Sequence, residues 1–199
     1  MIKFNYKKIQ MDIDTHIHLL RHFSEVDKKY ISYLKRKGFK DIELIEKQLK
    51  ILGGKFFSSF CKNPKELWEI IQKEIAIGNY KYIYYDNLNK YELIFSYTSS
   101  DFPNGIGTDS LIDITDLSES EKRKIVVTER GNGNIIKALK KNPKITYQIN
   151  VIIKFINGKY VLKTIFPGML APPFPDIKNQ TIEEYGLNKK FWDEHVVCL

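Results

Sequence analysis

The stretch that decides the fold is "KITYQINVIIKFINGKYVLKTIFPG", residues 144–168. Its apolar side chains alternate strictly from 145 to 155, which is the period of a strand with one buried face. Asn157-Gly158 is a dipeptide typical of a two-residue turn, and residues 160–166 have strand character again. This stretch therefore predicts an antiparallel hairpin, which the following proline-rich segment "GMLAPPFP" ends because proline cannot donate to a sheet.

Upstream of this hairpin, short segments also favour strands. "YKYIYYD" and "KYELIFSYT" are rich in aromatic and β-branched residues, and the turn "DNLN" joins them. "SLIDI" predicts a short strand, and the polar "TDLSESEKRK" predicts one helical turn. "IVVTERGNGNIIKALKKNP" predicts a strand, a glycine-bounded loop and a short helix.

The first half of the chain predicts helices. Apolar residues recur every three or four positions over 14–37, with Asp12 or Asp14 as the cap and Gly38 at the end. A shorter helix is expected over 41–52, where Gly53-Gly54 stops it.

Two further helices have clear boundary signals. "NPKELWEIIQKEIAIG" has asparagine as its cap, proline at its first position and glycine at its end. In "TIEEYGLNKKFWDEH", Thr181 and Glu184 are spaced as a capping box. The order predicts one α+β domain over 1–199, with N-terminal helices (about 12–78), a twisted antiparallel sheet (about 80–168) and a closing C-terminal helix (about 181–195).

Composition predicts an ordinary globular protein, with 43% hydrophobic and 28% charged residues. No apolar run approaches the roughly 18 residues that a membrane span needs, and the basic N-terminus lacks the apolar stretch of a secretory signal. A cytoplasmic location without membrane contact is therefore expected. Cys61 and Cys198 lie outside any CxxC motif, so we expect two free thiols and no zinc site.

The formal net charge is +8, from 32 Lys and Arg against 24 Asp and Glu. This excess favours an anionic partner, and RNA is the first candidate because its backbone is a line of phosphates. A composition biased generally toward lysine is the simpler alternative, because most of the lysines are scattered along the chain.

Three of the four histidines lie in "IDTHIHLLRHF", residues 13–23, and two interpretations compete. Asp-Thr-His-Ile-His is typical of the metal site of amidohydrolase barrels. Such a barrel takes about 250 residues, which exceeds the 199 of this chain. Only His22 and His195 remain as further imidazoles, so we predict no metal and no cofactor.

The alternative places these histidines on a helix. His16 falls within the apolar arc and is expected to be a core residue. His18 and His22 lie about 40° apart at its edge, with Arg21 nearby, while His195 lies near the other end of the chain on the predicted terminal helix. Two imidazoles can cleave RNA without metal, since one removes the 2′-hydroxyl proton and the other protonates the leaving 5′-oxygen.

Other residues are candidates for phosphate contacts. Thr164 is placed on one strand face with Tyr160, Leu162 and Phe166, where its hydroxyl could bind a phosphate oxygen or simply favour the strand. A cation must stabilise the charge on the phosphorane, and Arg21, Arg130 and Lys163 are the candidates. Arg130 lies in the loop "TERGNGN", which also offers backbone N–H groups.

Two stretches resemble ribonuclease toxins. "HLLRHF" and "DKKYISYLKRKG", followed by "KFFSSFCKNPKELWEIIQKEI", are similar to the start of RNase A-like toxin domains of bacterial contact-dependent inhibition systems. "GKYVLKTIFPG" resembles the closing strand of those domains and of the barnase–EndoU–colicin–RelE group. The resemblance implies a metal-independent endoribonuclease toxin acting on tRNA or another cellular RNA, with an acidic immunity or antitoxin protein as partner.

On this resemblance His18 or His22 takes the catalytic histidine role and Thr164 the strand-threonine role. Phe166 lacks the hydroxyl of the tyrosine that the toxins often have there. The segment "GIGTDSLIDITDLSESEKRKIVVTERG" and the tail with "APPFP" and "FWDEH" also depart, and look like a separate group of bacterial or phage proteins. We assign His18, His22, Thr164, His195 and Arg130 to catalysis and Arg21, Lys163 and Phe166 to substrate binding.

Two other functions remain open from the sequence. A non-catalytic RNA-binding or phage accessory protein would use the positive charge and stack bases on some of the 12 tyrosines. An enzyme of another class, including a metal hydrolase, is the third hypothesis. The distance of His195 from His18 and His22 separates the first hypothesis from the others.

Overall fold

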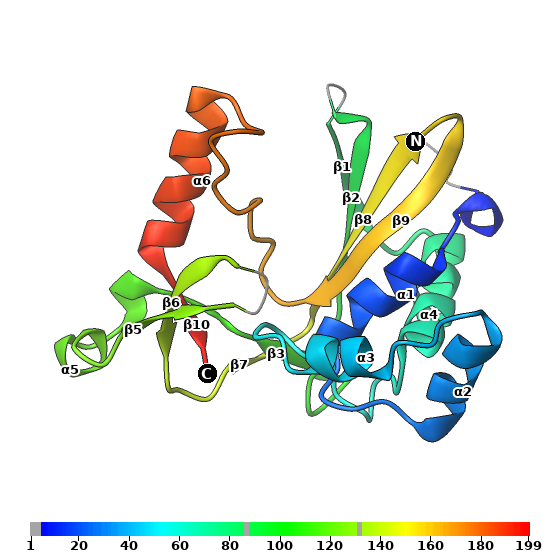
Figure 1. Cartoon of the computed structure of the whole chain (residues 1–199), viewed down its shortest axis with the longest axis horizontal. Coiled ribbons are helices and arrows are strands. Elements are labelled where there is room, and N and C mark those ends of the chain that lie inside the picture. Colours follow the sequence, from blue (N-terminus) through cyan, green and yellow to red (C-terminus); the bar gives the residue numbers. More distant parts are fainter. Residues whose placement is uncertain (1–4, 86–87, 131–132) are drawn as a thin grey trace.

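The computed structural model describes residues 5–85, 88–130 and 133–199, and its strands form three sheets (Figure 1). The large sheet has the order β1-β2-β8-β9 and consists of Lys81–Tyr85, Lys90–Ser96, Gln148–Ile156 and Lys159–Pro167. The C-terminal sheet has the order β4-β10-β6-β5 and consists of Leu111–Asp113, His195–Cys198, Ile135–Leu139 and Val126–Glu129. The small sheet pairs β3 (Gly107–Asp109) with β7 (Lys144–Thr146). This mixed architecture confirms the α+β class, although the predicted sheet is divided.

The predicted hairpin is β8 and β9, which pair antiparallel over their whole length. Asn157 and Gly158 form its turn with positive φ values of 50° and 76°, a conformation that glycine and asparagine tolerate best. Val151 and Ile153 are fully buried in the core between this sheet and the N-terminal helices. Of the turn expected between β1 and β2, Asp86 and Asn87 lie outside the described residues.

A β-bulge at Lys163 changes which side chains share a face of β9. Leu162 pairs with Ile153 but Thr164 pairs with Ile152, so Lys163 is an extra residue. Such an insertion reverses the alternation beyond it. Thr164 therefore lies on the opposite face from Leu162, and the prediction that Tyr160, Leu162, Thr164 and Phe166 share one face was wrong.

The N-terminal half is helical as predicted, but its first long helix is two. The helical elements are η1 (Tyr6–Lys8), α1 (Ile13–Leu19), η2 (Leu20–His22), α2 (Lys28–Arg36), α3 (Ile42–Leu49) and α4 (Pro64–Ile77). The expected continuous helix over 14–37 breaks at Phe23, whose backbone is extended and whose side chain is buried. Asp27 then caps a new helix by accepting the N–H of Tyr30 at 2.6 Å. The core position of Phe23 and this second cap override the helical periodicity.

The C-terminal sheet corrects two predictions. Residues 135–139 form strand β6 and not a helix, because they pair with β5 on one side and β10 on the other. His195 begins strand β10 rather than belonging to the terminal helix, and β10 runs parallel to β6. Val196 and Val197 are buried, as expected for a β-branched pair in a central strand.

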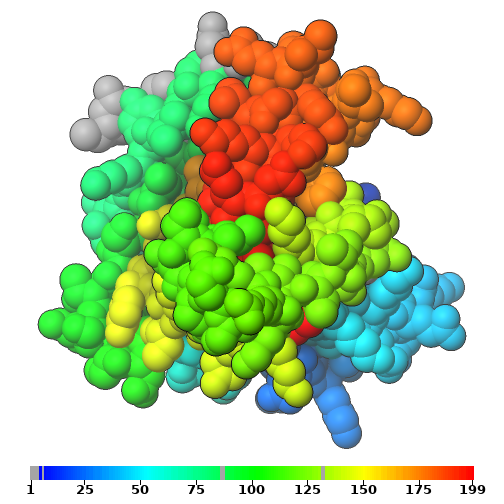
Figure 2. Space-filling model, turned by 90° about the vertical axis from the view of Figure 1, so that its left-hand side faces the viewer, coloured from blue at the N-terminus to red at the C-terminus, as the bar shows by residue number. Residues whose placement is uncertain are grey.

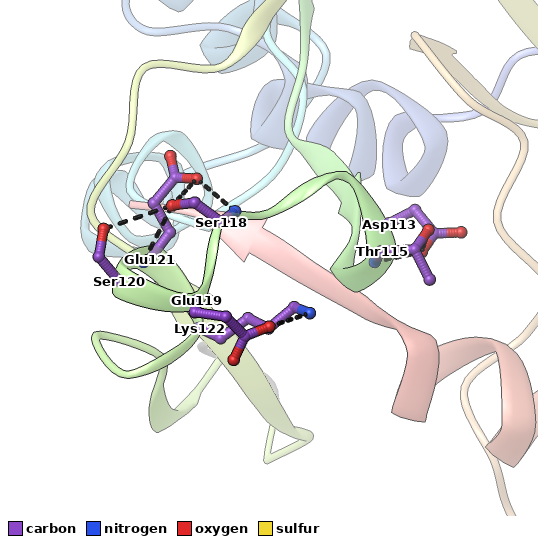
Figure 3. Close-up of polar contacts among 7 residues, drawn as sticks. All are labelled: Asp113, Thr115, Ser118, Glu119, Ser120, Glu121 and Lys122. Carbon is purple, nitrogen blue, oxygen red and sulfur yellow. Dashed lines mark hydrogen bonds and ion pairs between the residues drawn. The ribbon is translucent and has the colours of Figure 1, made fainter.

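The polar segment before β5 forms η4 (Ile114–Asp116) and α5 (Glu119–Lys122), which confirms the predicted helical turn. Figure 3 shows that Asp113 and Glu121 accept hydrogen bonds from nearby residues, whereas Glu119 pairs with Lys122. Asp113 accepts the N–H of Thr115 at 2.8 Å, and Ser118 forms a capping box with Glu121.

The terminal helix α6 (Ile182–Glu194) begins with the predicted capping box of Thr181 and Glu184. Figure 2 shows α6 in orange to red, above the green strands and loops of the C-terminal sheet. Cys61 and Cys198 are buried free thiols, as expected. Within the described residues, none of the helices is both long and apolar enough to cross a membrane.

Candidate anion-binding site

The end of the first helix brings His18, Arg21 and His22 beside β9. Thr15 donates its hydroxyl to the carbonyl of Leu162 at 3.0 Å, and seven residues later the ring of His22 lies 6.0 Å from that of Phe166, centroid to centroid. The helix and the strand therefore run side by side in the same direction (Figure 1). Thr164 lies on β9 between the two contacts and follows Lys163, whose charge acts on His18.

Three cations gather next to these histidines. Arg21, Lys55 and Arg130 all have pKa values lowered first by burial, and Arg21 and Lys55 also by positive neighbours, Arg130 among them. None of the ion pairs among the described residues includes one of the three. Half-buried cations without a carboxylate partner are costly, so the cluster is electrostatically prepared for an anion.

Lys55 is the residue of this cluster that sequence reasoning missed. Its ammonium group donates to the carbonyls of Arg21, Phe23 and Leu49 at 2.6, 3.3 and 2.9 Å. Burial first, and then Arg21 and Arg130, lower its pKa to about 8. Its three acceptors hold the ammonium in place, so Lys55 ties η2 to the end of α3 and adds positive charge behind the site. The only signal in the sequence was its position directly after Gly53-Gly54.

Two buried polar atoms of the site have no hydrogen-bond partner among the described residues. They are Nε of Arg21 and Oγ1 of Thr164. The other end of the Arg21 guanidinium is held, because Nη2 donates to Oε1 of Gln48 at 3.2 Å. An unsatisfied buried donor costs roughly 1–3 kcal/mol, and a bound oxyanion would satisfy both atoms.

Hydrogen bonding fixes the tautomer of His22. Its Nδ1 lies 3.1 Å from the carbonyl oxygen of Gly54. A carbonyl only accepts, so Nδ1 carries the proton and Nε2 of the neutral ring keeps a lone pair. Burial first, and then the charges of His18, Arg21 and Lys55, hold the pKa of His22 well below its usual value. A Cβ atom at Gly54 would lie 2.6 Å from the carbonyl oxygen of Thr108, so only glycine fits this approach.

His18 is half-buried and keeps access to the site. Burial first, and then the charges of Arg21 and Lys163, lower its pKa to about 4. Its imidazole is therefore neutral at pH 7 and able to accept a proton. Lys163, the exposed bulge residue, approaches closely enough to act on both His18 and Asp12.

His16 has the core role predicted for it. It is buried, with Nδ1 2.9 Å from the hydroxyl of Tyr30 and Nε2 3.4 Å from that of Tyr33. Burial lowers its pKa to about 4, opposed by the charge of Asp12. Both ring nitrogens are used, so His16 is a packing residue.

The structure does not bring His195 into this cluster. In β10 it pairs with Asp113 of β4, and its Nδ1 donates to the carbonyl of Phe191 at 2.8 Å. Its ring stacks on that of Phe191 with centroids 3.9 Å apart. The charges that it influences are those of Asp109 and Asp113, and none of the interactions within the described chain joins it to His18 or His22.

Arg130 connects the cationic cluster to the C-terminal helix. Its Nε donates to the carbonyl of Leu52 at 3.1 Å, and its guanidinium lies 5.7 Å from the centroid of the Trp192 ring. Of the loop expected around it, Gly131 and Asn132 lie outside the described residues.

A separate groove of the described surface lies elsewhere. It has a volume of about 770 Å³ and is lined by residues 23–28 and by 56–59, 61 and 62. None of the eight predicted site residues lines it. Within the described residues, no group of three or more His, Cys, Asp or Glu side chains could hold a metal ion.

No protein-family model and no curated protein matches the chain. Among solved structures, the chain is similar to a conserved hypothetical protein from Toxoplasma gondii with 9% identity and a TM-score of 0.48. That similarity covers 72% of this chain and 88% of the other, and it supports no argument about fold or function.

Proposed function

We propose that the cluster of Arg21, Lys55 and Arg130 binds a phosphodiester of RNA, which is then cleaved without a metal ion. The observation that carries this proposal is the set of half-buried cations without a carboxylate partner, beside two buried polar atoms that have no hydrogen-bond partner. A phosphate oxygen accepts from both Nε of Arg21 and Oγ1 of Thr164, which relieves their desolvation.

In the proposed reaction His18 acts as general base. It takes the proton of the 2′-hydroxyl, the 2′-oxygen forms a bond to phosphorus, and the bond to the 5′-oxygen breaks. The products are a 2′,3′-cyclic phosphate and a 5′-hydroxyl, whose proton comes from solvent water. Arg21 and Arg130 stabilise the charge that develops on the phosphorane, and His22 positions the turn through Gly54.

The proposed substrate is tRNA or another cellular RNA, as for the ribonuclease toxins that the sequence resembles. A toxin of this kind needs a neutralising partner inside the producing cell. With a formal net charge of +8 on this chain, we propose an acidic immunity or antitoxin protein that covers the cationic cluster.

A second candidate function is RNA binding without cleavage. It is favoured by the lowered pKa values of His18 and His22, because neither imidazole is protonated at pH 7 and able to serve as general acid. His195, the expected acid, has its Nδ1 bonded to Phe191. In this function the same cations and Thr164 hold the phosphate and no proton is transferred.

The test is incubation of total bacterial RNA with the protein in EDTA, followed by analysis of the RNA ends. We expect discrete fragments with 2′,3′-cyclic phosphates, lost in His18→Ala and retained in His195→Asn, the matched histidine control. Binding of RNA without fragments, equal for wild type and His18→Ala, would establish the second candidate. Loss of cleavage in His195→Asn with retained folding would contradict the assignment of His18 alone.

A further inference from the structure

A second groove lies between α6 and the β5–β6 hairpin. It has a volume of about 320 Å³, near the lower end of the range of about 300–1,000 Å³ for small-molecule sites. One wall is aliphatic, with Val127 and Ile135, whose side chains are 71% and 59% exposed. The other wall is aromatic and consists of Phe174, Tyr185 and Trp192.

The aromatic wall is held rigidly by the proline-rich segment. Nε1 of Trp192 donates to the carbonyl of Pro173 at 3.3 Å, and the rings of Phe174 and Trp192 lie 5.3 Å apart. The segment "APPFP" therefore has a structural role at the groove, which the folding of the hairpin and the helices does not need. A rigid pair of rings loses little entropy when a flat ligand binds.

Polar groups stand at one side of this groove. Lys137 and Lys189 both pair with the carboxylate of Asp193. Hydrogen-bond donors and acceptors therefore lie next to the aromatic rings. A nucleobase presents a flat apolar face and an edge of donors and acceptors, which matches such a lining. An aliphatic partner surface would take these charges out of water without offering them a hydrogen bond.

Arg130 contacts Trp192 of the groove and also belongs to the cationic cluster. Its guanidinium lies over Trp192, and its charge also lowers the pKa values of Arg21 and Lys55. One side chain thus separates the proposed phosphate position from the aromatic wall. In a nucleic acid the base and its phosphate are separated by one sugar, which is a comparable span.

We propose that this groove is a base-binding subsite, which accepts the nucleobase next to the phosphate held by Arg21 and Arg130. This inference rests on the proposed function. Trp192, Phe174 and Tyr185 contact the base and determine which nucleotide is preferred. Arg130 is shared between the phosphate and the subsite.

The test uses the four 2′-O-methyl dinucleoside monophosphates with a 3′-uridine, which cannot be cleaved, and inorganic phosphate as probes. Trp192 and the buried core residue Trp68 are the only tryptophans, so Trp192→Phe defines the background fluorescence. We expect saturable quenching by a dinucleotide and none by phosphate. Stacking on aromatic rings predicts that Trp192→Ala weakens dinucleotide binding at least about fivefold. Its affinity for phosphate should change less than twofold, and titration calorimetry measures both affinities because this variant lacks the fluorescent reporter.

Val127→Lys tests the opposite wall, because this exposed position tolerates lysine without unfolding the protein. Val127→Lys should weaken dinucleotide binding as much as Trp192→Ala does. Leu187→Ala should not weaken it, because Leu187 lies on α6 with Trp192 but outside the groove. Equal loss of phosphate and dinucleotide, or a dimer in sedimentation that Val127→Lys dissociates, would overturn the inference. Retained RNA cleavage in Val127→Lys, without any dinucleotide binding to the wild type, would overturn the subsite and leave the proposed function standing.

Discussion

The surroundings of His18 and of His195 are opposite in charge and in hydrogen bonding. Around His18 and His22 the perturbing charges are positive, and Arg21 and Thr164 keep unpartnered buried atoms. Around His195 the nearby charges are the carboxylates of Asp109 and Asp113, both of which accept backbone hydrogen bonds. Polar groups whose hydrogen bonds are all made within the protein stabilise the fold, whereas buried polar groups without a partner can bind a ligand. On this comparison we propose a functional role for the first region and a stabilising role for the second.

The largest expected effect is on Arg21. Arg21→Ala removes an oxyanion donor, which we expect to lower kcat/KM for RNA by roughly 100- to 1,000-fold. Arg21→Lys keeps the charge but not the planar fork and should recover only part of the rate. Single-turnover cleavage of one labelled RNA measures both variants. An unchanged rate in Arg21→Ala would move the site away from the cationic cluster.

Lys55 tests the division between function and stability, because its charge belongs to the cationic cluster while its hydrogen bonds hold backbone carbonyls in place. Lys55→Met leaves the carbonyls of Arg21, Phe23 and Leu49 without their donor. We expect a loss of about 3 kcal/mol in the free energy of unfolding, measured by urea denaturation. The exposed Lys163→Met is the matched control and should change stability by less than about 0.5 kcal/mol. Equal stability of the two variants would show that the Lys55 contacts contribute nothing.

The pH dependence of stability follows from His16, His18 and His22. His16 and His18 have folded-state pKa values of about 4, below the unfolded value of about 6.5, and burial holds the pKa of His22 well below that value too. Above pH 6.5 the folded and the unfolded state are both neutral at these positions, and the three histidines contribute no slope. Between pH 6.5 and 4 the unfolded state binds more protons, so stability falls by about 1.4 kcal/mol per pH unit for each histidine.

Urea denaturation across pH 4–8 measures this decline. His16→Gln should remove roughly one third of the slope without changing RNA cleavage, because His16 lies in the core. A slope that is identical in wild type and His16→Gln would contradict the burial of a neutral imidazole there.

The smallest effect is expected for His195. His195→Asn removes its stacking on Phe191 and should cost about 1 kcal/mol in the free energy of unfolding. Cleavage of RNA at saturating substrate should stay within about twofold of wild type. Thermal unfolding and the cleavage assay, run on the same preparation, separate these two outcomes. A tenfold slower reaction with normal stability would return His195 to the catalytic site.

Signals within short stretches of the sequence predicted several helices, strands and turns correctly. The alternation over 145–155, the Asn157-Gly158 turn, the Asn63 cap and the Thr181–Glu184 capping box all predicted what the structure contains. The core position of His16 also followed from helical periodicity. These features succeed because each depends on residues within about four positions of one another.

Only the tertiary structure decided the arrangement of the site. The bulge at Lys163, the pairing of β10 with β6 and the position of Lys55 all depend on segments far apart in the sequence. The bulge turned Thr164 to the other face of β9, and the pairing kept His195 out of the histidine cluster. The sequence by itself determined which cations and imidazoles the chain has. Long-range pairing decided which of them meet, because registry between distant strands is set by packing and not by local propensity.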